Sequence, residues 1–343
     1  MKYLPLLLGV LLLIVRYTTT RPIYHEGDRV RVSSEVTSLT KIAGLRIKFP
    51  PGSEVNYGDY VVVEGKVKNG ELSNPIIKET RASNNILINI RQKLINSFKN
   101  SLPTLDGELV AGIVIGAKSD LDKNFYNKLI NTGTSHVVVA SGMNVTMTAG
   151  FIMALLLNFL TRRKAILVTL IAILIYCYIA GFEAPIVRAA IMSFFAFSAQ
   201  LLGRVVSTIR ILFITAFIML FITPDWLTDI GFILSFSTTL SMILFEAKVN
   251  RLIHFVPGII KDSLSTSLSA QILAAPIIFF TFGRINPFSP LINALVLWTV
   301  SPIMIIGGVG AIISLIIPSV GEMIILLAYP LTRWFITVVS LLG

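Results

Sequence analysis

The chain has 343 residues, of which 54% are hydrophobic and 14% are charged, and its mean hydropathy is +0.80. Soluble domains carry about 25% charged residues, and several apolar runs here exceed the roughly 18 residues that a membrane-spanning helix needs, so an ordinary soluble protein is excluded. The net charge of +11 is typical of membrane proteins whose cytoplasmic loops are basic. We therefore predict a polytopic α-helical membrane protein.

Several chemistries are excluded by what the sequence lacks. Cys177 is the only cysteine, so the chain has no intrachain disulfide. Three scattered histidines without metal-ligand spacing predict no metal site and no cofactor. The Walker A pattern of an ATP-binding site and the H-E-x-x-H pattern of zinc hydrolases are both absent from the sequence.

Residues 1–16 contain the short apolar run LPLLLGVLLLIV, which follows Lys2. This run resembles the core of a signal peptide, but no A-x-A-type cleavage site follows it. We therefore expect an uncleaved N-terminal membrane anchor.

Residues 20–83 change to short alternating runs that are rich in β-branched residues. DRVRVSSEV, GLRIKF and DYVVVEGKVKNG have the strand pattern, and PPGSEVNYGD and KNGELSNP are interpreted as turns. About five short strands predict a small all-β barrel similar to the OB type. OB barrels bind single strands through basic grooves and aromatic platforms. The candidate DNA contacts are Arg46, Lys48, Tyr57 and Tyr60. The alternative, which we favour, is that the aromatic side chains are core and the cations face water.

Residues 86–132 predict two or three amphipathic helices. One apolar stripe repeats at i+4 spacing through Ile86, Ile90, Leu94 and Phe98. We expect these helices to lie in the membrane interface or to pack on the helical bundle. Asp120 is the expected N-cap of the last of them.

Residues 133–343 predict a nearly continuous multi-span membrane domain. The expected spans lie near 136–160, 164–181, 185–203, 209–223, 226–245, 264–282, 288–306, 307–317 and 321–341. Pro302, Pro318 and Pro330 interrupt the last three spans. Residues 288–317 are therefore expected to form a broken or re-entrant segment, which needs shielding by protein or by a water-filled cavity.

Basic residues follow alternate spans. They are Arg162, Arg163 and Lys164, then Arg204 and Arg210, then Lys248, Arg251 and Lys261. In the alternate loops, around GFEAP, TPDW and GRINP, the only basic residue is Arg284. By the positive-inside rule the basic loops are cytoplasmic, so we expect the chain before His136, including the β domain, to be extracytoplasmic.

The segment TSHVVVASGMNVTMTAGF, residues 134–151, carries polar side chains inside an apolar span. On one helix the polar stripe would comprise His136, Ser141, Asn144 and Thr148, and the lipid-facing stripe would comprise Val138, Val145 and Ile152. Gly142, next to the β-branched run at residues 137–139, makes an unwound turn at the Ser-Gly pair possible. Two interpretations stay open, namely hydrogen bonds that join helices and the lining of a hydrated passage.

Arg188 lies inside the apolar run APIVRAAIMSFF. A charge within a span costs a few kcal/mol on insertion scales, so Arg188 should face the interior with Glu183 or Asp229 as its partner. The alternative is that its side chain reaches toward lipid headgroups. Further polar positions in predicted spans are Asp229, Ser235, Gln271 and Asn293.

These motifs resemble those of the ComEC-type competence proteins, the inner-membrane channels for transforming DNA. TGTSHVVVASGMNVTMTAGF carries the resemblance at Gly133, His136, Ser141, Gly142 and Asn144. PIVRAAIMSFF, PDWLTDIGFILSFSTT and AQILAAPIIFFTFGRINPFSPLINALV match further motifs in the same order. The resemblance covers roughly residues 20–340, and four ordered motifs are far more specific than one.

The resemblance implies a non-enzymatic channel in the bacterial cytoplasmic (inner) membrane that passes single-stranded DNA into the cytoplasm during natural transformation. The implied pore-lining residues are His136, Ser141, Gly142, Asn144, Thr148, Arg188, Asp229, Ser235, Gln271 and Asn293. The implied partners are single-stranded DNA, the lipid bilayer, a separate DNA receptor, a separate nuclease and a cytoplasmic DNA motor or helicase; homo-oligomerisation stays open. Many members continue into a metallo-β-lactamase-like domain, and we expect this chain to be a short form without nuclease activity.

Two functions from other classes remain as alternatives. The first is a secondary transporter of another anionic solute, with Arg188 as its anion site. The absence of an evident internal repeat opposes this transporter hypothesis, because many carriers contain inverted repeats. The second is an intramembrane hydrolase with Ser141 as its nucleophile, which a serine-directed probe would reveal.

Overall fold

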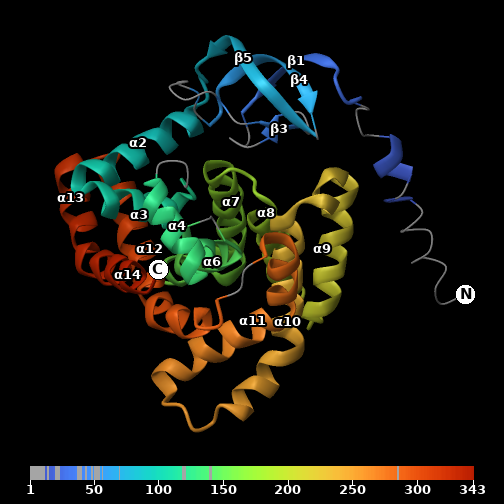
Figure 1. Cartoon of the computed structure of the whole chain (residues 1–343). Coiled ribbons are helices and arrows are strands. Elements are labelled where there is room, and N and C mark those ends of the chain that lie inside the picture. The colour runs from blue at the N-terminus through green and yellow to red at the C-terminus, as the bar shows by residue number, and fades with distance from the viewer. Residues whose placement is uncertain are drawn as a thin grey trace, which may run out of the picture. The chain divides into compact units, whose positions relative to one another are not determined.

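The computed structural model describes residues 12–13, 15–19, 24–36, 41–42, 45–47, 49, 55, 57–68, 70–117, 121–138, 141–283 and 286–343. Most of the predicted anchor therefore lies outside the described residues. The chain forms two compact units, which are treated separately below (Figure 1). The first comprises Met1–Gln92 and Phe217–Leu227, and the second comprises Lys93–Ala216 and Thr228–Gly343.

The described part of the first unit contains a five-stranded sheet with the order β1-β4-β5-β3-β2. The strands are β1 (Arg29–Glu35), β2 (Lys41–Ile42), β3 (Leu45–Ile47), β4 (Tyr60–Lys68) and β5 (Glu71–Arg81). β3 and β5 run parallel, while the other paired strands are antiparallel. The sequence-based expectation of about five strands is confirmed.

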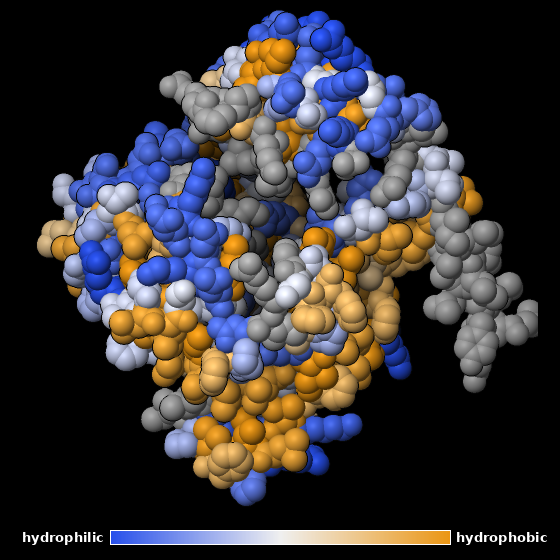
Figure 2. Space-filling model, in the orientation of Figure 1, coloured by the Kyte–Doolittle hydropathy of each residue, from blue (hydrophilic) through white to orange (hydrophobic). Residues whose placement is uncertain are grey.

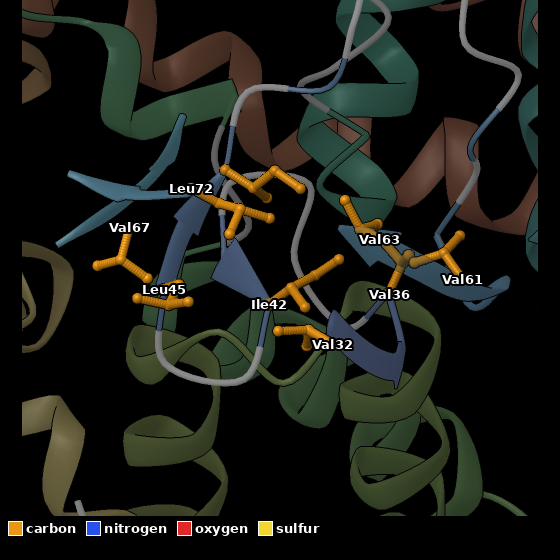
Figure 3. Close-up of a cluster of buried hydrophobic side chains, with 9 residues drawn as sticks. Val32, Val36, Ile42, Leu45, Val61, Val63, Val67 and Leu72 are labelled. Atoms are coloured by element: carbon orange, nitrogen blue, oxygen red, sulfur yellow. The ribbon is translucent and has the colours of Figure 1, made fainter. Parts of the chain in front are cut away.

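Alternation along the strands builds the core of this sheet. β4 buries Val61, Val63 and Val67 and exposes Lys66 and Lys68. Figure 3 shows these valines in one cluster with residues of the other strands. The other labelled members are Val32, Val36, Ile42, Leu45 and Leu72. Burying one Val or Leu side chain contributes about 1.5–3 kcal/mol, so the cluster accounts for much of the stability of such a small sheet.

The predicted turn KNGELSNP is wrong beyond Gly70. Gly70 has φ +71°, and Lys68 already pairs with Glu71, so β5 starts directly after a tight turn. The register shifts farther along β5, where Asn74 has φ +49°. This irregularity accommodates Pro75, because a proline nitrogen cannot donate to a strand ladder.

The helices that precede the predicted spans are α2 (Ile86–Ser101), α3 (Thr104–Ile115), α4 (Lys123–Thr132) and α5 (Ser135–Val138). In α2 the predicted apolar stripe is buried at Leu94 and Phe98, but Ile86 is exposed. The prediction that α3 is amphipathic is wrong, because its residues from Asp106 onward are buried on nearly every side. Asp122 is the N-cap of α4, while Asp120 lies outside the described residues.

The membrane-type helices are α6 (Gly142–Leu156), α7 (Arg162–Ala180), α8 (Ala184–Leu201), α9 (Thr208–Ile222), α10 (Ile230–Leu252), α11 (Gly258–Phe282), α12 (Ser289–Ser314), α13 (Pro318–Leu326) and α14 (Tyr329–Leu342). Among the described residues, five helices, α7, α8, α10, α11 and α12, are long and apolar enough to cross a membrane. The count rises to six if α13 and α14, which are bent by 44°, form one span. α6 and α9 are apolar but shorter.

Three predicted span boundaries are corrected. α12 continues through Pro302, so the expected break at residues 306–307 does not occur; neighbouring helices in a bundle let a helix tolerate the backbone bond that proline removes. α10 begins after Asp229, because Pro224–Thr228 forms the 3₁₀ helix η2. The expected last span is divided into α13 and α14.

Small residues allow helices of the second unit to approach closely. A Cβ added at Gly321 of α13 would overlap the backbone of Ser314 in α12, a contact typical of membrane helix pairs. α6, α7 and α8, which are green in Figure 1, share a core that includes Val145, Cys177 and Ala189. These contacts fix where the polar residues of the second unit meet.

Two exposed tryptophans join α12 to α14. Trp298 Nε1 donates to the carbonyl of Leu295 at 2.8 Å, and Trp334 Nε1 donates to the same carbonyl at 3.0 Å. Their ring centroids lie 6.2 Å apart. The carbonyl of Leu295 is therefore one point of contact between α12 and α14.

Figure 2 shows apolar side chains over much of the surface around α10 and α11. The exposed large apolar residues of these two helices include Ile243, Leu244, Ile272, Phe279 and Phe280. Exposed apolar surface of this extent marks contact with a partner or a membrane, and on helices of this length it fits hydrocarbon.

Candidate functional site

Residues 134–151 do not form one helix. α5 ends at Val138, Ser141 has an extended backbone with φ −102° and ψ 162°, and α6 begins at Gly142. The predicted unwound turn at the Ser-Gly pair is confirmed. The predicted continuous stripe is wrong, because His136 lies on a different helix from Asn144.

The side chain of Asn144 uses both ends of its amide. Ser141 Oγ donates to Asn144 Oδ1 at 3.0 Å, and Asn144 Nδ2 donates to the carbonyl of Ile113 at 2.8 Å. Asn144 is 0% exposed. It therefore joins the first turn of α6 to the last turn of α3.

The last turn of α3 receives a second bond from another helix. Tyr176 Oη on α7 donates to the carbonyl of Val114 at 3.1 Å. Carbonyls in the last turn of a helix lack intrahelical donors. Asn144 and Tyr176 thus satisfy carbonyl groups that would otherwise be buried without partners.

The lipid-facing stripe expected beside these polar residues is wrong. Val138 and Val145 are both 0% exposed. Val145 packs in the core that α6 shares with α7 and α8. On one continuous helix, these two side chains were expected to face lipid. With the helix broken before α6, both face the protein interior.

Arg188 on α8 is held by α10. Its Nη1 donates to the carbonyl of Ser235 and to Thr239 Oγ1, and its guanidinium lies 5.9 Å from the centroid of the Phe236 ring. Among the described residues, the hydrogen-bond acceptors of Arg188 do not include the expected partners Glu183 and Asp229. Asp229 caps α10 instead, accepting from the backbone N–H of Phe232 at 3.1 Å.

Gly142 lies directly against Arg188. A Cβ added at Gly142 would overlap Arg188 Nη2 and would approach the side chain of Ala189. A larger residue at this position would therefore have to displace the end of the Arg188 side chain. Gly142, Arg188 and Ser235 form one contact that joins α6, α8 and α10.

The remaining predicted pore residues lie apart from this contact. His136 is exposed on α5, where Nδ1 lies 3.1 Å from the carbonyl of Gly133. Thr148 is partly buried on α6, and Gln271 is partly buried on α11. The structure therefore gathers Ser141, Gly142, Asn144, Arg188 and Ser235, and leaves the others elsewhere.

Asn293 belongs to a separate polar cluster. Its Nδ2 lies 3.4 Å from both Ser267 Oγ on α11 and Ser289 Oγ on α12. Ser241 on α10 likewise donates to the carbonyl of Ser269 on α11. In these helices the polar side chains join neighbours, as the first of the two sequence interpretations expects.

Sequence patterns missed an ion pair that joins a buried carboxylate of α3 to a half-exposed arginine of α14. Asp106 is 0% exposed, accepts from Thr332 Oγ1 at 2.7 Å and lies 3.0 Å from Arg333 Nη2. Arg333 Nε also donates to Tyr329 Oη at 3.0 Å. A carboxylate in the apolar run DGELVAGIVI was the available signal, but its partner lies 227 positions away and follows no pattern.

The candidate DNA contacts of the β unit are only partly described. The Arg91 guanidinium lies 4.9 Å from the centroid of the Tyr57 ring, so Tyr57 already stacks on a protein cation. Tyr60 is 40% exposed. Lys48 and the side chain of Arg46 lie outside the described part. Among the described residues, no group of three or more His, Cys, Asp or Glu side chains could hold a metal ion.

Comparison with known proteins gives consistent relatives. The chain is 24% identical to ComE operon protein 3 of Bacillus subtilis over 214 residues, which are 61% of this chain and 26% of that protein. It is 28% identical to an uncharacterized protein of Aquifex aeolicus over 208 residues, 60% of this chain and 48% of the relative. It is also 28% identical to Recombination protein 2 of Haemophilus influenzae over 140 residues, 38% and 18% of the two chains.

The chain spans less than half the length of each of these relatives. No solved structure matches it significantly. The sequence model of the competence protein family matches residues 113–343, which include the helix break, Arg188 and every membrane-type helix. With its membrane-spanning helices, the chain is a multi-pass membrane protein, and it belongs to the ComEC-type competence protein family.

Proposed function

We propose that this chain forms the passage through which single-stranded DNA crosses the cytoplasmic membrane during natural transformation. Membership of the competence protein family supports a role in DNA uptake. The observation that carries the channel role is the break before α6 inside the multi-pass region. Non-helical backbone at membrane depth is tolerated only where protein shields it or where it lines a water-filled cavity.

Polar groups beside the break support the same proposal. Ser141 is partly buried at the break, while Gly142 and Arg188 lie in contact next to it. A strand of phosphates needs a wet route that is neutral or basic. Asn144 contributes by holding the start of α6 against α3 rather than by facing the strand, because its side chain is completely buried.

The β unit is the extracytoplasmic part of the proposed route. Its strand order and its parallel β3–β5 pair fit a partly open, five-stranded barrel of the OB type. The basic loops expected to be cytoplasmic would leave this unit on the extracytoplasmic side. We therefore propose that the incoming strand meets the OB-like unit before it reaches the membrane helices.

A hydrolase role is less well supported by the same geometry. Ser141 Oγ is engaged with Asn144 Oδ1, and His136 is held on the separate helix α5 by the carbonyl of Gly133. A nucleophilic serine needs a base within hydrogen-bond reach. The structure therefore favours the transport hypotheses over Ser141 chemistry.

Uptake of DNA labelled in one strand would test the proposal. Cells carrying the wild-type gene, a complete deletion or the restored gene would be scored for DNase-resistant strand in the cytoplasm and for strand bound outside. We expect the deletion to abolish cytoplasmic entry while surface binding persists. Normal entry of DNA in the deletion strain would disprove the channel role. If the deletion strain instead loses the uptake of small anions, the transporter hypothesis would be favoured.

A further inference from the structure

Within the described part of the chain, no carboxylate lies at ion-pair distance from the guanidinium of Arg188. Its Nη1 bonds are to neutral oxygens of α10, and Nε is buried without a hydrogen-bond partner among the described residues. An uncompensated cation within a membrane bundle is costly. An anion bound beside Arg188 would offset that cost.

Three helix ends add positive potential at the same place. Gly142 is the first residue of α6, while Arg188 and Ser235 lie within the first two turns of α8 and α10. Each helix N-terminus is equivalent to roughly half a positive elementary charge. Interrupted membrane helices present such ends to the anionic groups of transported substrates. The Arg188 guanidinium therefore lies beside the positive end of α6.

The two acidic residues that the sequence suggests as partners, Glu183 and Asp229, form no ion pair with Arg188 among the described residues. Asp229 Oδ1 accepts from the backbone N–H of Phe232 as the N-cap of α10. Glu183 occupies the N-cap position of α8, and its side chain makes no capping hydrogen bond there. Arg188 instead contacts the first residue of α6 and the side of α10. Neither carboxylate therefore neutralises Arg188 directly.

We propose that Arg188, with the N-terminal turns of α6, α8 and α10, binds a backbone phosphodiester of the DNA strand as it enters the membrane domain. This inference rests on the proposed function and assigns a substrate group to one position. Guanidinium groups favour phosphate because charge-assisted bonds to its oxygens are strong. A lipid headgroup carries the same phosphate chemistry, but the Arg188 side chain contacts Thr239 of α10 and the first residue of α6, so it is engaged between protein helices.

Binding of a fluorescein-labelled oligothymidylate to the purified full chain would test the site. The protein would be reconstituted in phosphatidylcholine nanodiscs, and fluorescence anisotropy would be measured over a range of salt concentrations. Arg188→Gln should weaken binding about tenfold and reduce the salt slope by about 0.7, which is one phosphate contact to a single strand. Arg163→Gln, which removes an exposed cation from α7, is the matched control and should leave both quantities unchanged.

Gly142→Ala provides a second variant that keeps the charge. The added Cβ would displace Arg188 Nη2, so we expect weaker binding with unchanged monodispersity and helix content. This variant keeps the test decisive if Arg188→Gln does not fold. Equal affinity and equal salt slope for the wild type and both variants would overturn the proposal, and so would equal losses for Arg163→Gln and Arg188→Gln.

Phosphatidylglycerol nanodiscs separate the two sources of phosphate. If this anionic lipid removes the difference between wild type and Arg188→Gln, a lipid headgroup occupies the site and the DNA assignment is wrong. The uptake experiment is independent of this result. Loss of entry in the deletion strain with unchanged binding by Arg188→Gln would reject the site but keep the channel, and the opposite pair of results would reject the channel alone.

Discussion

Asn144 donates to the carbonyl of Ile113 and accepts from Ser141, so both ends of its amide bond inside the protein. From the sequence, the same residue was a pore-lining candidate because its type is rare in lipid. The sequence can identify a polar side chain in an apolar span. It cannot tell a bond to a neighbouring helix from contact with water, because the end of α3 lies 31 residues away.

Asn144→Leu should lower the free energy of unfolding by about 1–3 kcal/mol, because the carbonyl of Ile113 loses its donor in a buried place. Thermal unfolding of the purified protein in detergent would measure this loss. Asn158→Leu is the matched control, since Asn158 is exposed and bonds only within its own turn. If Asn144→Leu abolishes uptake at unchanged stability and abundance, the side chain belongs to the DNA route after all.

Arg333→Gln should destabilise the protein by about 2 kcal/mol, below the usual cost of breaking a buried pair because Arg333 is 46% exposed. The change leaves the fully buried Asp106 carboxylate without its cation. Adding Asp106→Asn should restore part of the loss, because the amide carries no charge and can still bond Thr332. Denaturant unfolding of the single and double variants would measure the coupling, and strictly additive losses would contradict it.

At the scale of elements, the sequence predicted most helices but few of their ends. Hydropathy located α7, α8, α10 and α11 because each apolar run is long enough to span a membrane. Pro302 predicts a break, yet α12 continues through it. α3 was assigned an amphipathic role, yet it is a core helix. Such errors arise because burial depends on neighbouring helices, which a single sequence does not contain.

Gly321→Ala should destabilise the α12–α13 packing by about 1–3 kcal/mol, because the new methyl group would overlap the backbone of Ser314. Backbone cannot move aside as a flexible side chain can. Gly308→Ala on α12 is the control, since nothing lies within 4 Å of its added Cβ. Alanine should be neutral or slightly stabilising there through helix propensity. Similar melting temperatures for both variants would show that α13 can shift without cost.

At the scale of the whole molecule, the predicted orientation in the membrane is open to direct measurement. Cys177 is the only cysteine of the chain and is buried, so Cys177→Ala provides a background for single exposed cysteines. In spheroplasts, a membrane-impermeant maleimide should label Lys66→Cys on β4 and should miss Arg163→Cys on α7. Arg163→Cys should react only after permeabilisation. Labelling of Arg163→Cys alone in sealed spheroplasts would reverse the orientation.

The shared carbonyl of Leu295 gives the protein a native optical reporter. Two of its three tryptophans donate to that single oxygen, and the third, Trp226, lies in the 3₁₀ helix η2. In a Trp226→Phe background, all indole emission would come from the pair that joins α12 to α14. Separation of α14 would change the polarity around both rings together, so movement of the C-terminal helices could be followed by spectroscopy without any attached dye.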